Sequence, residues 1–224
     1  NCSKTNIILL LMENYVINIE HLQKSFGNKS VLIDINLKIK KGETVATLGK
    51  SGSGKSVTFQ CIAGLLLPDS GLIELLGKNV AEINYEELTN LRKKIGFLFQ
   101  SGALYDSMSV KENLAFPLIR QNRKISQDEI DKKVEQRLKD VNLLDAIDKM
   151  PSELSGGMRK RLGLARTLIL EPEVMLYDEP TTGLDPITTR EISYLIKSIK
   201  EKYNMTSLIV THDMICTKIV ADRV

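Results

Sequence analysis

Two kinds of apolar pattern divide the chain into short extended segments and longer helical ones. Residues 16–19 and 31–39 predict strands with one buried face, since apolar and polar residues alternate there. In the second segment, Ile33, Ile35, Leu37 and Ile39 fall on the same predicted face. Three other runs are mostly apolar and do not alternate with charged residues, which is typical of strands in a parallel sheet that is covered on both sides. These runs are residues 44–48, 174–177 and 207–210.

A helical repeat of apolar residues occupies the middle of the chain, over residues 99–154. Ser126 and Glu129 have the spacing of a capping box, and an apolar stripe follows them. Two more helices are expected, at 158–170 and around 192–199. Strands that alternate with helices favour an α/β fold with a parallel sheet, into which the middle segment is inserted as a helical unit.

Composition narrows the class of protein without identifying a substrate. The 224 residues are 42% hydrophobic and 26% charged with a formal net charge of +3, which suits a globular domain and gives no reason to expect a nucleic-acid partner. Cys2, Cys61 and Cys216 are too far apart for a zinc motif or a disulfide framework, which favours a reducing compartment. The apolar run at 7–12 is too short to cross a membrane.

A glycine-rich segment follows the run at 44–48 and precedes a predicted helix. It fits the phosphate-binding P-loop pattern, in which glycines let main-chain N–H groups converge on phosphate oxygens at the positive end of a helix. In such a site Lys55 reaches the β- and γ-phosphates, and the Ser56 hydroxyl is a ligand for Mg²⁺. A glycine-rich turn before a helix is the alternative. The expected nucleotide-binding residues here are Gly49, Lys50, Ser51, Gly52, Ser53, Gly54, Lys55, Ser56 and Val57.

Two carboxylates, Asp178 and Glu179, follow the apolar run at 174–177, where an acidic side chain has no packing role. Asp178 suits the coordination shell of Mg²⁺, usually through water. Glu179, one residue on, points elsewhere and is a candidate general base that polarises an attacking water. The alternative is that the pair caps a loop.

Ser155, Gly156 and Gly157 form a second glycine motif just before the helix predicted at 158–170. Free main-chain N–H groups at a helix N-terminus make an anion site. One nucleotide rarely needs two such sites from one subunit, so the second motif is expected to serve a nucleotide held by another copy of the chain. By itself, Ser-Gly-Gly more often marks a loop.

The order and spacing of these motifs, over residues 16–224, resemble the ATP-binding cassette family, the ATPase subunits of ABC transporters. The resemblance implies a P-loop NTPase (RecA-like) core with a parallel sheet, an N-terminal antiparallel β-subdomain and an α-helical subdomain inserted at about residues 101–160. It implies one domain over residues 14–224. Residues 1–11 lack the pattern of the sequence that follows, so residues 1–13 are expected to lie outside the core, and Met12 is a candidate native start. Related cassettes continue beyond Val224 with a strand pair and often a helix.

The resemblance also assigns roles to single residues. Gln100 senses Mg²⁺ and touches the membrane partner, and is a candidate metal ligand with Ser56 and Asp178. Asp185 reaches across the dimer to the nucleotide. His212 contacts the γ-phosphate. Together with the roles given above for Lys55 and Glu179, this makes Glu179, His212 and Lys55 the expected catalytic residues. Each single residue has an alternative: Gln100 as a surface residue, Asp185 as a helix N-cap and His212 as a satisfied histidine at a strand end.

Phe26 lies 29 positions before Lys55, where the family places an aromatic ring that stacks on adenine. The alternative is a core phenylalanine of the N-terminal sheet.

Residues 96–118 closely resemble the Mla-type ATPases of bacterial phospholipid transport, and so does Met158, which stands where the family's signature normally ends in glutamine. This resemblance implies a homodimer that binds ATP and Mg²⁺ and docks on membrane permease subunits, with accessory lipid-binding subunits. The ATPase subunit would then be cytoplasmic and would lie on the inner face of the bacterial inner membrane. Two alternative functions remain: an ABC transporter ATPase for another substrate, and an ABC-like ATPase that regulates a cell-envelope complex without transport. A P-loop kinase or GTPase is disfavoured because neither needs the signature glycines.

Overall fold

The computed structural model describes residues 15–49 and 52–224, so the predicted phosphate-binding residues Lys50 and Ser51 lie outside the described residues. The strands are β1 (Tyr15–Phe26), β2 (Lys29–Lys40), β3 (Thr44–Leu48), β4 (Ser70–Leu75), β5 (Lys78–Asn79), β6 (Ile95–Leu98), β7 (Val174–Asp178) and β8 (Thr206–Thr211). The helices are α2 (Lys55–Ile62), α3 (Tyr85–Arg92), α4 (Val110–Gln121), α5 (Gln127–Asp140), α6 (Gly156–Leu168), α7 (Pro186–Tyr203) and α8 (Met214–Val220). Short 3₁₀ turns occupy Leu144–Ala146 and Pro151–Glu153.

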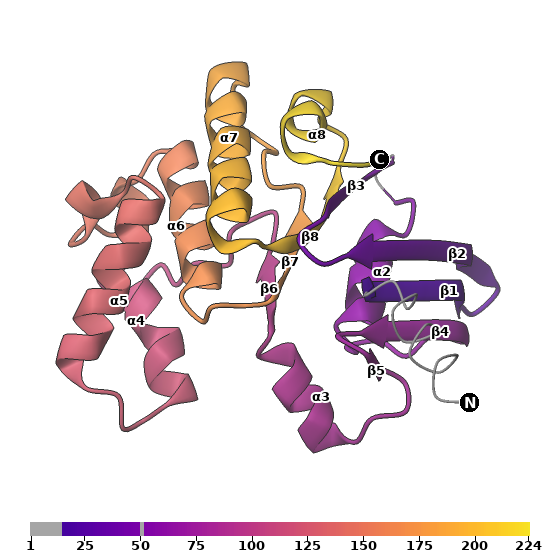
Figure 1. Cartoon of the computed structure of the whole chain (residues 1–224). Helices are drawn as coiled ribbons and strands as arrows, with labels where there is room; N and C mark the ends of the chain where they lie inside the picture. The colour runs from indigo at the N-terminus through magenta and orange to yellow at the C-terminus, as the bar shows by residue number, and fades with distance from the viewer. Residues whose placement is uncertain (1–14, 50–51) are drawn as a thin grey trace, which may run out of the picture.

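The strands form two sheets of different kinds, as the sequence predicts. An antiparallel sheet has the order β2-β1-β4-β5, and a parallel sheet has the order β3-β8-β7-β6. Figure 1 shows the antiparallel sheet at one side of the molecule, helices α4 and α5 at the other side, and the parallel sheet between them. This arrangement agrees with the predicted fold class.

Both faces of the parallel sheet are covered, which explains why its strands are mostly apolar on both sides. On one face, Met175, Tyr177 and Ile209 belong to a core shared with α6, α7 and α8. On the other face, Leu176 and Leu208 belong to a core shared with α2 and the antiparallel sheet. Since the strands are parallel, their carboxyl ends lie at one edge of the sheet, where a ligand site is expected.

The N-terminal strands depart from the simple alternation that the sequence predicts. β1 extends far beyond residues 16–19. Its pairing with β2 is irregular on both sides of Leu22, and Asp34 on β2 has φ +54°. The irregularity reverses the alternation along β2, so that Leu32 is buried and Ile33 is 69% exposed. The prediction that Ile33 shares a buried face with Ile35 and Ile39 was therefore wrong.

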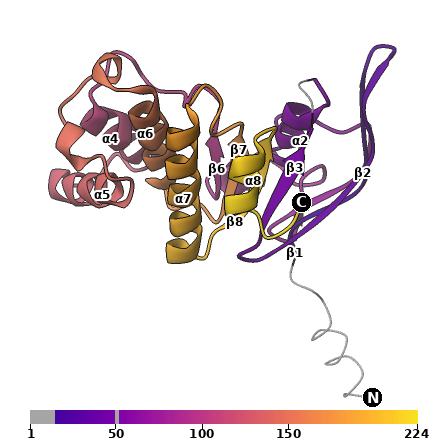
Figure 2. The same cartoon turned by 90° about the horizontal axis from the view of Figure 1, so that it is seen from above.

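Helices α4, α5 and α6 pack together at the end of the molecule away from the antiparallel sheet (Figure 2). Ser126 caps α5 by accepting a hydrogen bond from the N–H of Glu129 at 3.3 Å. In the described structure only this half of the predicted capping box is present. Helix α6 begins two residues earlier and ends two residues earlier than the predicted 158–170. The predicted limits of the helical subdomain, 101–160, stay a prediction.

A charged cluster joins the end of α5 to the end of α7. The Asp140 side chain is 2% exposed, and its carboxylate accepts hydrogen bonds from Arg137, Lys202 and Tyr203 at 3.0, 2.6 and 2.5 Å. Burial alone would raise the pKa of Asp140, but the hydrogen bonds from Lys202, Tyr203 and two other neighbours outweigh it and hold the pKa below its ordinary value. The helical region is thus attached to the rest of the fold through an ionised carboxylate.

Helix α7 buries the face that its sequence pattern predicts. Ile192, Leu195, Ile196 and Ile199 are buried, while Tyr194 on the opposite side is 60% exposed. Such an amphipathic helix lies on a globular core. Over the parts of the chain that the structure describes, no helix combines the length and the apolar character needed to cross a membrane.

Candidate functional site

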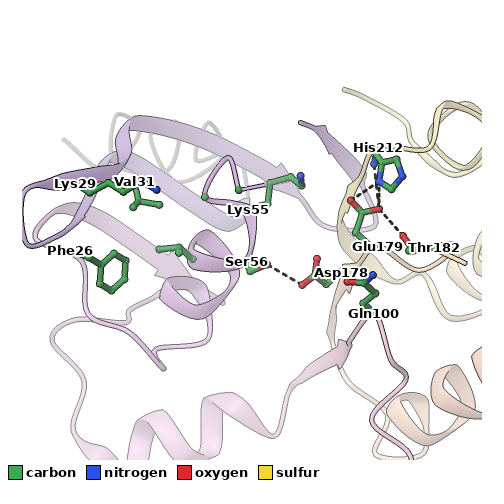
Figure 3. Close-up of a pocket in the computed structure, with 13 residues that line it drawn as sticks. Phe26, Lys29, Val31, Lys55, Ser56, Gln100, Asp178, Glu179, Thr182 and His212 are labelled. Atoms are coloured by element: carbon green, nitrogen blue, oxygen red, sulfur yellow. Dashed lines mark hydrogen bonds and ion pairs between the residues drawn. The ribbon is translucent and has the colours of Figure 1, made fainter. Parts of the chain in front are cut away.

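An open cleft of about 900 Å³ lies between the antiparallel sheet and the carboxyl ends of the parallel strands (Figure 3). One wall comes from β1, β2 and the start of α2. The other wall comes from residues that follow β6, β7 and β8. The lining residues are Phe26, Lys29, Val31, Gly52, Gly54, Lys55, Ser56, Val57, Gln100, Asp178, Glu179, Thr182 and His212.

The first wall contains the turn from β3 into α2. Gly52 and Gly54 have φ values of +81° and +89°, which glycine adopts without the strain that a side chain would add. A Cβ at Gly54 would also lie 2.9 Å from the carbonyl oxygen of Val31, so the turn packs directly on β2. Helix α2 begins at Lys55, and its first amide groups have no preceding turn to bond. These donors and the helix dipole make this wall a site for anionic oxygens.

Lys55 and Ser56 present a cation and a hydroxyl to the cleft (Figure 3). Lys55 Nζ donates to the carbonyl oxygen of Gly49 at 2.6 Å, so the ammonium lies against the loop. The Ser56 hydroxyl donates to Asp178 Oδ2 at 3.2 Å, which joins the two walls. Burial raises the pKa of Asp178 above its ordinary value, and the hydrogen bond from Ser56 opposes that rise.

Glu179 follows β7 directly and turns toward the end of β8. It has a left-handed φ of +50°. Its carboxylate accepts hydrogen bonds from the hydroxyls of Thr182 and Thr211 at 3.2 and 3.3 Å, and it lies 2.9 Å from Nδ1 of His212. The Glu179 side chain is 13% exposed and the His212 side chain 67% exposed, so the imidazole is the more accessible member of the pair.

The far end of the cleft carries an exposed aromatic ring. Phe26, the last residue of β1, is 48% exposed, which argues against the alternative of a core phenylalanine. Lys24 Nζ lies 5.7 Å from the centroid of this ring. Lys29 and Val31 line the cleft beside it but were not predicted. Neither belongs to a local motif, and only the pairing of β1 with β2 brings them to the site.

Gln100 reaches the cleft from the segment that follows β6. Its main-chain carbonyl accepts a hydrogen bond from Lys160 Nζ at 2.5 Å. Lys160 is 8% exposed, and burial lowers its pKa. Thr182 also lines the cleft without having been predicted, because its role depends on the turn that places it beside Glu179.

Ser155, Gly156 and Gly157 are not among the described residues that line the cleft. The Ser155 hydroxyl caps α6 by accepting a hydrogen bond from the N–H of Met158 at 3.2 Å. A Cβ at Gly157 would lie 2.7 Å from the methyl carbon of Thr188 on α7. The starts of α6 and α7 are therefore packed against each other, outside the cleft of their own chain.

Asp185 is likewise outside the described lining of the cleft. Its carboxylate accepts hydrogen bonds from the N–H groups of Ile187 and Thr188 at 2.9 and 3.0 Å, which is the N-cap that the sequence offered as an alternative. The Thr188 hydroxyl also donates to Asp185, and this bond holds the pKa of Asp185 below its ordinary value.

A parallel sheet, a glycine turn that leads from one of its strands into a helix, and acidic residues at the end of another of its strands together define a P-loop nucleotide-binding domain. The exposed ring at one end of the cleft suits a base, and the start of α2, with Lys55 and Ser56, suits phosphates (Figure 3).

Comparison with known proteins narrows this class. Residues 32–182 match the family described as ABC transporter. The chain is 44% identical over 207 residues to the probable ribonucleotide transport ATP-binding protein mkl of Mycobacterium leprae (strain TN), which covers 92% of this chain and 59% of mkl. It is 40% identical over 203 residues to the intermembrane phospholipid transport system ATP-binding protein MlaF of Haemophilus influenzae, which covers 91% of this chain and 76% of MlaF. The dimeric structure of the ATP-binding cassette MJ0796, in a post-hydrolysis state with ADP and Pi, superposes with a TM-score of 0.81 at 33% identity and covers 91% of each chain.

The chain belongs to the ABC transporter family, as an ATP-binding cassette. The predicted enzyme class, an ATPase, agrees with this family, and the similarity to MlaF confirms the predicted resemblance to Mla-type ATPases. The chain spans only 59% of the length of mkl. The names of the two relatives refer to ribonucleotides and to phospholipids, so family membership alone does not fix the substrate.

Proposed function

We propose that this chain is the ATP-hydrolysing subunit of a bacterial inner-membrane ABC transporter. The pairing of Glu179 with His212 beside the P-loop carries this proposal. A P-loop alone binds a nucleotide. A carboxylate within hydrogen-bond reach of a histidine, in the same cleft as Lys55, adds the groups that hydrolysis needs.

In the proposed reaction, Glu179 orients and polarises the water that attacks the γ-phosphate in line. Its carboxylate is engaged by two hydroxyls and by His212 in the structure. A turn of His212 toward the γ-phosphate would free a lone pair of Glu179 for that water. Lys55 stabilises the negative charge that develops on the phosphoryl oxygens.

The residues around Ser56 fit a magnesium ion. The Ser56 hydroxyl and the Asp178 carboxylate form an oxygen pair at 3.2 Å, and Gln100 adds an amide oxygen to the same cleft. Among the residues described, no three His, Cys, Asp or Glu side chains come together as a cage. Such a site suits Mg²⁺, which keeps several waters and takes few protein ligands. Bound there, the ion would neutralise charge on the β- and γ-phosphates.

The second glycine motif supports a homodimer that closes around two ATP molecules. Ser155, Gly156 and Gly157 start a helix outside the cleft of their own chain, so their amide groups are available to a nucleotide held by a second copy. The structural similarity to a dimeric cassette supports the same assembly. Asp185 lies at the start of the helix that packs against Gly157, and we assign it to this dimer contact.

For the cargo we propose phospholipid. The resemblance of residues 96–118 and Met158 to Mla-type ATPases supports this choice, as does the 40% identity to MlaF. The partners would then be membrane permease subunits and accessory lipid-binding subunits, with the ATPase on the cytoplasmic face of the inner membrane. The 44% identity to mkl makes a ribonucleotide transporter the second candidate.

The test is to purify the full-length protein from membranes, identify the membrane protein that accompanies it, and analyse bound lipid by mass spectrometry. ATP turnover of that complex is then measured with phospholipid vesicles and, separately, with ribonucleotides. Bound phospholipid and stimulation by the vesicles support the first proposal, whereas stimulation by ribonucleotides supports the second. Hydrolysis inside an envelope complex that binds neither would identify a regulator, and a complex without ATP hydrolysis would reject the enzymatic role.

A further inference from the structure

Helix α6, which begins with the second glycine motif, holds the segment after β6 at two main-chain carbonyls. Lys160 Nζ donates to the carbonyl oxygen of Gln100 at 2.5 Å. Arg166 Nη1 donates to the carbonyl oxygen of Ala103 at 2.7 Å. The two bonds bracket the turn that follows the cleft-lining glutamine.

Between these bonds the turn lies directly on the helix. A Cβ at Gly163 would come within 3.1 Å of the Cα of Gly102 and within 3.2 Å of its carbonyl oxygen. Gly102 and Ala103 have φ values of +76° and +48°, so the chain is sharply bent here. A Cβ at position 163 would require the turn to move by a few tenths of an ångström, so the turn and the helix are in main-chain contact.

Of the two charged side chains in this contact, Lys160 is the more deeply buried, at 8% exposed. A buried ammonium needs acceptors for its protons, so separating it from the Gln100 carbonyl would leave a poorly solvated charge. Gln100 itself is exposed, and it lines the nucleotide cleft. The buried bond therefore fixes the main chain of a residue whose side chain is free to act in the site.

We propose that Lys160 is a positioning residue for ATP hydrolysis, which clamps the main chain of Gln100 to α6 so that Gln100 and the second glycine motif move as one body. This inference rests on the proposed function. Gln100 belongs to the cleft of its own copy, whereas Ser155, Gly156 and Gly157 are assigned to the ATP of the other copy. The clamp is then a direct mechanical link between the two ATP sites of the dimer.

The test compares four forms of the full-length protein, purified with its membrane subunits: the unchanged protein, Lys160→Met, Gln100→Ala and the double variant. Lys160→Met is expected to lower kcat about tenfold or more, because small displacements of a positioned group are costly. KM for ATP should change little, since the P-loop is untouched. In the Gln100→Ala background the same change should cause no further loss, because Lys160 acts through the side chain that Gln100→Ala removes. Lys160→Arg, which keeps a cationic donor, should recover most of the activity.

The matched control is Lys200→Met, which removes a lysine of 18% side-chain exposure that is paired with Asp222 away from the cleft. Its kcat should equal that of the unchanged protein.

Equal losses from Lys160→Met in both backgrounds, or an effect on KM alone, would overturn the positioning role while leaving the ATPase proposal intact. An unchanged protein without ATP turnover would reject the proposed function itself. If Lys160→Met does not fold, Lys160→Ala, which also removes the donor, replaces it in the same two backgrounds under the same criteria.

Discussion

The imidazole Nδ1 of His212 lies 2.9 Å from the carboxylate of Glu179, although the two residues are 33 positions apart. Adjacent parallel strands produce this contact, because β7 and β8 end side by side. Glu179 is held there at φ +50°, a conformation that costs a residue with a side chain about 1 kcal/mol. Backbone strain of this kind is typical of functional positions.

Glu179→Gln tests the proposed base directly. The amide keeps the size of the side chain but does not accept a proton, so ATP turnover should fall by about 10²- to 10⁴-fold. ATP should still bind, and an ATP-bound dimer should accumulate, which size-exclusion chromatography with and without ATP would detect. Glu173→Gln, at an exposed carboxylate paired with Lys94, is the control and should leave turnover unchanged. Full turnover in Glu179→Gln would remove this residue from the role of base.

Met158 and Ser155 separate the side-chain and main-chain contributions of the second glycine motif. Met158→Gln restores the usual family residue and leaves the amide groups of α6 in place, so turnover should stay within a small factor of that of the unchanged protein. Ser155→Arg removes the cap on α6 and puts a bulky side chain at the start of the helix, so turnover should be abolished. Steady-state ATPase assays measure both. Loss of turnover in Met158→Gln would show that methionine itself is required.

Phe26 gives a test of base stacking. Phe26→Ala should weaken ATP binding by about 1–3 kcal/mol, the usual range for one aromatic ring stacked on a base. Phe26→Trp should bind ATP at least as well as the unchanged protein. The loss should not affect folding, because the ring is 48% exposed. Ile33→Ala, at an exposed apolar residue of the same sheet outside the cleft lining, is the control. Equal ATP affinity in Phe26→Ala and Ile33→Ala, measured by calorimetry, would exclude stacking.

The Asp140 cluster predicts a pH-dependent stability. The folded-state pKa of Asp140 lies below its ordinary value of 3.8, so its stabilising effect is present above that pH and is lost as the pH falls through the folded-state pKa. Asp140→Asn should lower the free energy of unfolding at neutral pH by about 3 kcal/mol, since Lys202 and Arg137 lose a buried partner. Denaturant titrations at pH 7 and pH 3 would show a smaller difference at the lower pH. The control, Glu129→Gln at a 54% exposed side chain, should change stability little at either pH.

Local patterns predicted three of the four strands of the parallel sheet, because a strand that is buried on both faces is mostly apolar whatever its register; β6 was not predicted. The runs at 44–48, 174–177 and 207–210 are mostly apolar and carry no charged residue, and they form β3, β7 and β8. The phosphate-binding turn before Lys55 could also be predicted, because all the residues that form it belong to one short segment of the sequence. The structure also brings Ser56 to Asp178, which are 122 positions apart.

Features that depend on pairing between distant segments were beyond the sequence pattern. Ile33 was assigned to the wrong face because the irregular pairing of β1 with β2 reverses the alternation. Lys29 and Val31 became cleft residues only through that pairing. The bond from Lys160 to Gln100 spans 60 positions and joins a lysine of α6 to a glutamine in the segment after β6. No spacing rule within one helix indicates such a contact.

Because Gly157 and Thr188 are in contact, a substitution at one of these positions should be tolerated only with a matching substitution at the other. The Thr188 methyl group fills the volume that a side chain at position 157 would require. An alanine at 157 should therefore be accepted only together with a serine at 188, which gives up the methyl group and keeps the hydroxyl bonded to Asp185. Homologous cassettes that share this packing should vary at the two positions jointly, and a chimera that exchanges only one of the two helix starts should be the form that fails.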